Sequence, residues 1–272
     1  MFNQPLPPFT NVVANGIATM KVPSYDLTLL RVMLVLGGTA FTKAMITDIK
    51  LKLGARMVYN CSGPDLDRIN KYKNIFDTPN YLTIDFTERD QTDMAVRELG
   101  GYSLPALRGL GDMTIEVTIA GATAPTLAAF AQFNAPQANP MIMKLVKFQS
   151  PSALAGRFPI NLQLGGALVK RLHLVYTGAD WTLIANGNLN RVEVKKNGLT
   201  IHDMFDLDNR FLNQEYRKVP QSRGYVVDLI QDNNFRGHLD TSDARSLEVN
   251  AYLTAGDAVT TIAEVLDLPT NL

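Results

Sequence analysis

The sequence contains Leu-Val-Leu-Gly-Gly-Thr-Ala-Phe at residues 34–41 and a related stretch, Leu-Val-Tyr-Thr-Gly-Ala-Asp-Trp, at residues 174–181. Each stretch closes an alternating apolar segment, residues 27–36 in the first case and residues 167–176 in the second. Apolar runs that end at glycine are typical of strands closed by turns. A segment that recurs in this way predicts an internal duplication, which decides the fold before any other pattern.

The segments that follow the two stretches also match in order and type. Period-2 alternation of apolar and polar residues in several of them predicts strands with one buried face. The matched pairs are 49–53 with 192–196, 81–86 with 225–230, 113–119 with 247–253, and 127–133 with 259–268. The shared order favours a duplicated domain over the alternative, one large β-rich domain with accidental similarity.

One short helix is expected in each half. Ser62-Gly63-Pro64-Asp65 and Thr200-Ile201-His202-Asp203 both fit a capping pattern in which a hydroxyl precedes an acidic residue by three positions. We therefore expect helices near residues 64–77 and 202–218. The apolar residues with helical spacing are Leu66, Ile69, Tyr72 and Phe76 in the first, and Phe205, Leu207, Phe211, Leu212 and Tyr216 in the second.

The length of 272 residues suits two domains, which we place at residues 1–135 and 136–272, with an extended linker near residues 134–140. The net charge is zero, so no basic bias points to direct binding of nucleic acid. No apolar run is long enough for a transmembrane segment. Residues 1–10 contain three prolines and no charged side chain, and they predict an extended arm that is either disordered or ties neighbouring subunits together.

The chain offers little that points to catalysis. The three histidines, His173, His202 and His238, are scattered and form no metal-binding motif, and the one cysteine, Cys61, excludes an internal disulfide. No nucleophile elbow and no phosphate-binding glycine motif is present. We therefore predict no catalytic and no cofactor-binding residues, and we do not expect an enzyme.

Acidic residues cluster in two places in the second half, and oxygen-rich clusters of this kind can bind calcium. The candidate ligands are Asp240 and Asp243 in one cluster and Asp206 and Asp208, near Asp203, in the other. The more ordinary interpretation is helix capping and turn chemistry. The sequence leaves both interpretations open, with calcium in a structural role as the one cofactor considered.

Many short strands, glycine turns and one helix per half predict an all-β fold. The arrangement that fits is a double jelly roll, which consists of two tandem eight-stranded β-sandwich barrels with one short inserted helix per half. A jelly roll buries the inner faces of two four-stranded sheets and leaves only short edges exposed.

Three stretches of sequence carry a family resemblance: Asn-Val-Val-Ala-Asn-Gly-Ile-Ala-Thr at residues 11–19, Leu-Gly-Gly-Thr-Ala-Phe-Thr-Lys-Ala at residues 36–44, and Asn-Phe-Arg-Gly at residues 234–237. The chain resembles the major capsid proteins of corticovirus-type phages, which are tailless icosahedral bacteriophages with an internal membrane. The likeness extends over nearly the whole chain.

The resemblance implies a structural protein that forms homotrimers. Three chains with two barrels each would give a pseudo-hexagonal capsomer that tiles an icosahedral shell around the internal membrane. The implied partners are neighbouring capsomers and, further, vertex and inner-membrane proteins of the virion. The implied location is the virion shell, after synthesis in the bacterial host cytoplasm. Calcium is associated with the capsid in this family, which adds some weight to the acidic clusters.

Other jelly-roll functions remain open at this point. A carbohydrate-binding module would need exposed aromatic residues, whereas Trp181 is the only tryptophan. We expect Trp181 in a loop, either packed at a sheet edge or anchoring an interface. A cupin-type enzyme would need a histidine-rich metal site, and a scaffold with an unidentified partner is the least specific alternative.

Overall fold

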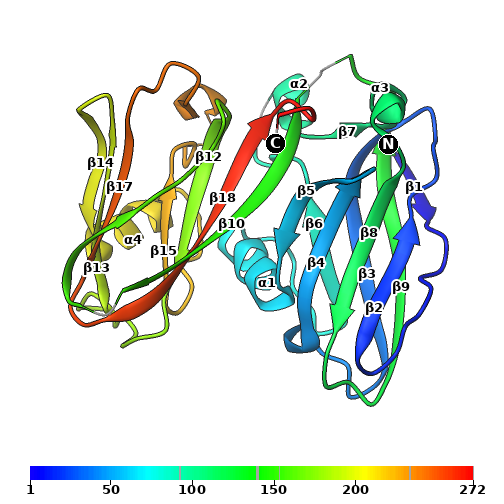
Figure 1. The fold of residues 1–272 in the computed structure, drawn as a ribbon, viewed down its shortest axis with the longest axis horizontal. Coiled ribbons are helices and arrows are strands. Elements are labelled where there is room, and N and C mark those ends of the chain that lie inside the picture. The colour runs from blue at the N-terminus through cyan, green and yellow to red at the C-terminus, as the bar shows by residue number, and fades with distance from the viewer. Residues whose placement is uncertain (92, 139–140, 153, 233, 272) are drawn as a thin grey trace. The chain divides into compact units, whose positions relative to one another are not determined.

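The computed structural model describes residues 1–91, 93–138, 141–152, 154–232 and 234–271 (Figure 1). The chain forms two compact units. Unit 1 comprises residues 1–71, 75–146 and 267–272, and unit 2 comprises residues 72–74 and 147–266. The change from one unit to the other after Val146 comes later in the chain than the expected boundary between residues 135 and 136. Asn139 and Pro140 of the expected linker lie outside the described residues.

Unit 1 contains two sheets. One has the strand order β1-β9-β3-β6, and the other places β5, β4, β8 and β2 side by side (Figure 1). The bounds in the first sheet are β1 Phe2–Pro5, β9 Ala124–Asn134, β3 Thr28–Thr39 and β6 Tyr81–Asp85. Those in the second sheet are β5 Arg56–Cys61, β4 Ile46–Leu53, β8 Met113–Ile119 and β2 Gly16–Lys21. Short strand β7, Tyr102–Ser103, adds to β3.

Unit 2 repeats this plan. One of its sheets has the order β10-β18-β12-β15 and the other has the order β11-β17-β13-β14. The bounds are β10 Ile142–Ser152, β18 Asp257–Asp267, β12 Leu168–Val175 and β15 Gly224–Asp228, then β11 Gly156–Ile160, β17 Leu247–Leu253, β13 Leu189–Lys196 and β14 Leu199–Phe205. Strand β16, Leu239–Asp240, pairs with one end of β12.

The two units have the same strand topology. Strand β3 lies between β9 and β6 in unit 1, as β12 lies between β18 and β15 in unit 2. Strand β4 lies between β8 and β5, as β13 lies between β17 and β14. All the strand pairs expected from the sequence repeat are therefore topological equivalents. The structure confirms the duplication and the double jelly roll, with β5 and β14 as an equivalent pair that the sequence comparison missed.

Alternation of side chains builds the core of each unit. Strand β8 is the clearest case, because Met113, Ile115, Val117 and Ile119 are buried while the residues between them are half-buried. Strand β3 does not end at its glycines but continues through Gly38, where φ is +86° and an added Cβ would lie 2.0 Å from the Ala124 carbonyl oxygen. Only glycine fits this close approach of two backbones.

The longest helices are α1, Gly63–Tyr72, and α4, Asp206–Glu215, one after each of the equivalent strands β5 and β14. The Ser62 hydroxyl accepts a hydrogen bond from the Asp65 N–H at 3.2 Å, which confirms the predicted cap of the first helix. Unit 1 also contains the one-turn helices α2, Met94–Arg97, and α3, Leu104–Leu107. Single 3-10 turns η1 Lys43–Met45, η2 Arg108–Leu110 and η3 Phe235–Gly237 complete the described elements.

The predicted start of the second helix is wrong. Thr200, His202 and Asp203 lie in β14, which pairs antiparallel with β13, and the helix begins only at Asp206. The apparent cap is therefore part of a strand, because pairing with β13 outweighs the local capping pattern. The first helix also ends earlier than expected, since Phe76 lies beyond α1 and is 86% exposed.

Candidate functional site

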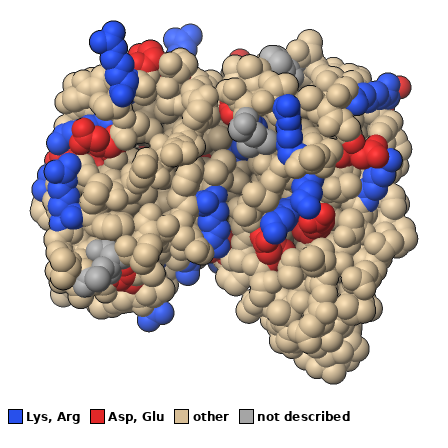
Figure 2. All heavy atoms as spheres, in the orientation of Figure 1, with Lys and Arg blue, Asp and Glu red and all other residues tan. Residues whose placement is uncertain are grey.

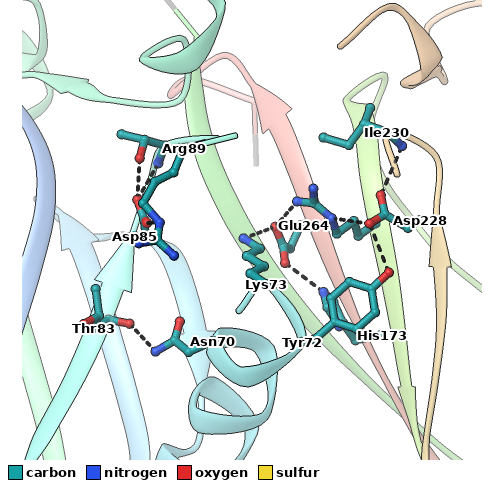
Figure 3. A network of polar contacts seen from close by, with 12 residues as sticks. Asn70, Tyr72, Lys73, Thr83, Asp85, Arg89, His173, Asp228, Ile230 and Glu264 are labelled. Carbon is teal, nitrogen blue, oxygen red and sulfur yellow. Dashed lines mark hydrogen bonds and ion pairs between the residues drawn. The ribbon is translucent and has the colours of Figure 1, made fainter. Parts of the chain in front are cut away.

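A buried group of charged side chains lies in unit 2, on strands β12, β15 and β18 (Figure 3). Arg171 Nε lies 2.9 Å from Asp228 Oδ2, and Arg171 Nη1 lies 3.3 Å from Glu264 Oε2. These three residues are direct cross-strand neighbours, because Arg171 pairs with Asp228 on one side and with Glu264 on the other. The sheet register alone thus brings the charges together.

The last residue of helix α1 and the residue that follows it complete this network. Lys73 Nζ lies 2.6 Å from Glu264 Oε2, and the Tyr72 hydroxyl donates to Asp228 Oδ2 at 3.0 Å (Figure 3). His173 Nε2 lies 2.7 Å from Glu264 Oε1, and its ring packs edge-on against Tyr72 with centroids 5.6 Å apart. The network pairs two cationic side chains with two carboxylates, so its formal charges from these four groups cancel.

The network is closed to solvent. The side chains of Arg171, Asp228 and Glu264 are at most 1% exposed, and that of Lys73 is 9% exposed. Burial by itself would raise the pKa of Glu264, but Lys73, Arg171 and the His173 hydrogen bond hold that pKa well below its ordinary value. Burial raises the pKa of Tyr72 well above its ordinary value, and the neighbouring Asp228 carboxylate adds to the rise. Each of these buried charges therefore depends on its partner inside the network.

The sequence analysis did not single out Lys73, Arg171, Asp228 or Glu264. A signal was present, since Glu264 interrupts the apolar run of residues 262–266, and Arg171 follows Lys170 within a mostly apolar strand segment. His173 lies on the same side of its strand as Arg171 and is 3% exposed. Its role is a hydrogen bond inside the network and not a surface role.

In both long helices an asparagine side chain donates a hydrogen bond to a backbone carbonyl oxygen of the outer strand of a sheet. In unit 1, Asn70 Nδ2 of α1 donates to the carbonyl oxygen of Thr83 in β6 at 2.8 Å (Figure 3). In unit 2, Asn209 Nδ2 of α4 donates to the carbonyl oxygen of Val226 in β15 at 3.0 Å. Strands β6 and β15 each end the order of their sheets, so these carbonyls face away from the neighbouring strand and need another donor.

Helix α4 consequently buries a polar face, contrary to the expected apolar one. Its buried residues are Asp206, Asn209, Arg210 and Asn213. Of the apolar residues with helical spacing in this segment, Phe211 is 63% exposed and Leu207 is 36% exposed. The helical spacing of these residues was predicted correctly, but the apolar face of α4 is turned to solvent. The polar face packs inward because Asn209 and Arg210 donate hydrogen bonds to the carbonyl oxygens of Val226 and Ala185.

The structure does not gather the candidate calcium ligands into one site. Asp206 is buried and paired with Arg210 Nε at 3.1 Å, whereas Asp208, two residues on, is exposed. Asp240 Oδ1 accepts from the Ser242 N–H at 2.8 Å, and Asp243 pairs with Lys196. Among the described residues, no three His, Cys, Asp or Glu side chains lie close enough together to hold a metal ion.

The contacts of Trp181, His202 and Cys61 are packing contacts and hydrogen bonds within the fold. Trp181 lies in a loop as expected, stacks on the Arg210 guanidinium at 4.1 Å, and donates from Nε1 to the Gln221 carbonyl at 3.1 Å. His202 Nε2 lies 2.8 Å from the Tyr225 hydroxyl, and burial lowers the pKa of His202 to about 4. Cys61 is buried at the end of β5.

On the face drawn in Figure 2, charged side chains are sparse and of both signs. Basic and acidic side chains alternate there without forming a large area of one sign. No helix in the described ranges combines the length and the apolar character that a membrane crossing would require. The described residues therefore form two jelly rolls of one topology, with a charged network buried inside unit 2.

Comparison with known proteins assigns this scaffold to a family. The model of the viral coat protein P2 N-terminal domain matches residues 3–134, and that of the P2 C-terminal domain matches residues 142–269. The chain belongs to the viral coat protein P2 family. It is thus a viral major capsid protein with a structural, non-enzymatic role in the virion, and the expected relation to corticovirus-type capsid proteins is confirmed.

Solved structures of similar fold are also capsid proteins. The major capsid protein P2 from Bacteriophage PM2 aligns with a TM-score of 0.87 at 17% identity, over 100% of this chain and 99% of that one. A chain of Sulfolobus Turreted Icosahedral Virus gives 0.74 at 14% identity, over 98% and 91%, and a PBCV-1 virus capsid chain gives 0.67 at 12%, over 97% and 92%. No curated protein sequence matches significantly.

Proposed function

We propose that three copies of this chain form a homotrimer, and that these trimers are pseudo-hexagonal capsomers that tile an icosahedral shell around an internal membrane. The observation that supports the proposal is the identical strand topology of the two units. Three copies would supply six lobes of nearly the same build, which is what a hexagonal lattice requires of a trimer.

The charge distribution is compatible with dense packing. A chain with no net charge can approach its own copies without strong self-repulsion. Further proposed contacts are those to neighbouring capsomers and to vertex and inner-membrane proteins. Calcium enters the proposal only as an ion shared between copies, because no single copy brings three described ligands together.

The test is the solution mass of the purified protein, measured by light scattering over a range of concentrations, with and without a calcium chelator. The expected result is a mass near three times 30.0 kDa. Loss of the trimer on chelation would support shared calcium. A monomer of 30.0 kDa under all conditions would contradict the trimer and would favour a binding module, such as one for carbohydrate, on the same fold.

A further inference from the structure

Unit 2 carries an exposed apolar surface made by helix α4 and the loop before β13. We call it the α4 surface and define it as Leu183, Ile184, Leu207 and Phe211. Their exposed fractions are 85%, 88%, 36% and 63% respectively. Leu207 and Phe211 are four residues apart on the helix, so they share one face.

Hydrogen bonds hold the loop against the helix, so that the two parts form one surface. The Leu207 N–H donates to Asn186 Oδ1 at 2.8 Å, and Arg210 Nη2 donates to the Ala185 carbonyl oxygen at 3.1 Å. The base of the loop is fixed by Asp257, whose carboxylate accepts from the Thr177 N–H at 3.1 Å and the Gly178 N–H at 2.8 Å. Leu183 and Ile184 therefore lie on a loop whose position is held by hydrogen bonds.

The size and polarity of the α4 surface favour a protein partner. The four side chains expose on the order of 500 Å², which is near the upper end of the largest apolar patches on monomeric proteins. That area is smaller than the roughly 800 Å² per partner of a standard interface, so it suits the apolar centre of a larger contact. Exposed Asp208, Glu215 and Arg217 follow on the same helix or just after it and give a rim of both signs.

We infer that the α4 surface docks on a second copy of this chain in the ring contact of the trimer, an inference that rests on the proposed function. A coat protein meets its own copies more often than any other partner. Contacts that form permanently are more apolar than those between separately stable assemblies, which points to the contact within a trimer. A rim without a basic cluster does not favour a lipid surface. The interfaces in a ring of three copies are heterologous, which means that they join two different surfaces of the chain. The α4 surface of one copy therefore meets a different face of the next copy.

The test compares Ile184→Asp and Phe211→Asp, singly and together, with the wild type and with Leu154→Asp. Leu154 is 77% exposed and lies next to β11, at the opposite edge of the sheet from β14, so it is a matched control. The measurements are light-scattering mass and the fluorescence of Trp181, which stacks on Arg210 beside the α4 surface. Circular dichroism and thermal melting show whether each variant is folded.

We expect the wild type and Leu154→Asp to be trimers, and the double variant to be a folded monomer whose association is weakened at least 100-fold. Phe211→Leu should remain a trimer. A folded double variant that is still a trimer overturns the inference and leaves the proposed trimer intact. A wild type that is monomeric at all concentrations contradicts the proposed trimer and the inference with it. Trimeric variants that lose binding to phosphatidylglycerol vesicles would assign the α4 surface to lipid, which also overturns the inference.

Discussion

Asn70 Nδ2 donates a 2.8 Å hydrogen bond to the Thr83 carbonyl oxygen, and the equivalent helix in unit 2 repeats this contact through Asn209 and Val226. A side chain thus supplies the donor that the missing next strand would have supplied. Asn70 is 7% exposed and Asn209 is 2% exposed, so water competes poorly for either carbonyl. The inserted helices of both jelly rolls are docked on their sheets by the same chemistry.

Replacing Asn70 with leucine should destabilise the fold by about 0.5–1.5 kcal/mol, because the half-buried Thr83 carbonyl would lose its donor. The measurement is the free energy of unfolding in urea. Asn80→Leu, at an exposed position just before β6, is the control and should change stability by less than about 0.5 kcal/mol. Equal effects of the two variants would contradict the importance of this hydrogen bond.

Replacing Lys73 with methionine should cost about 3–5 kcal/mol of stability, because the fully buried Glu264 carboxylate loses a cation 2.6 Å away. Urea unfolding at neutral pH measures the loss. The double variant Lys73→Met/Glu264→Gln removes both charges and should recover part of it. A single variant that is as stable as the wild type would show that Arg171 alone neutralises Glu264.

His202 should make the fold sensitive to mild acid. Its pKa in the folded protein, about 4, lies below the value of about 6.5 expected in the unfolded chain, so the unfolded state binds the proton more readily. The contribution of neutral His202 to the free energy of unfolding is therefore fully present above about pH 6.5 and is lost as the pH falls toward 4. At pH 4.5 the loss should be about 2 kcal/mol.

The measurement for His202 is the difference in urea stability between pH 7 and pH 4.5. His202→Gln keeps a side chain that can bond the Tyr225 hydroxyl but removes the titration, so its pH dependence should be smaller by this amount. Other acid-sensitive groups are common to both proteins and cancel in the comparison. An unchanged pH dependence in the variant would exclude His202 as the cause.

Gly38→Ala should destabilise unit 1 by more than 2 kcal/mol, since φ is +86° and the new Cβ would clash with the Ala124 carbonyl oxygen. Gly109→Ala is the control, because an added Cβ there meets no atom within 4 Å. Thermal melting of the two variants distinguishes them. A Gly38→Ala protein that melts with the wild type would mean that strands β3 and β9 can separate locally at no cost.

The sequence by itself determined the duplication, the five matched pairs of strands and the first helix cap. These features depend on alternation along one strand or on contacts within a few residues, as between Ser62 and Asp65, so local pattern is sufficient to predict them. The resemblance over three short stretches determined the family. The predicted second helix failed at its start because pairing of β14 with β13 is a contact that local pattern does not encode.

Only the tertiary structure decided which polar residues are inside. Arg171, Asp228 and Glu264 are far apart in sequence and meet through sheet register, and Lys73 joins them from a segment that follows a helix. The orientation of α4 was decided in the same way, because Asn209 turns inward to reach a strand carbonyl and Phe211 is left in solvent. Helical periodicity identifies two faces, but the neighbour that each face meets is set by the fold.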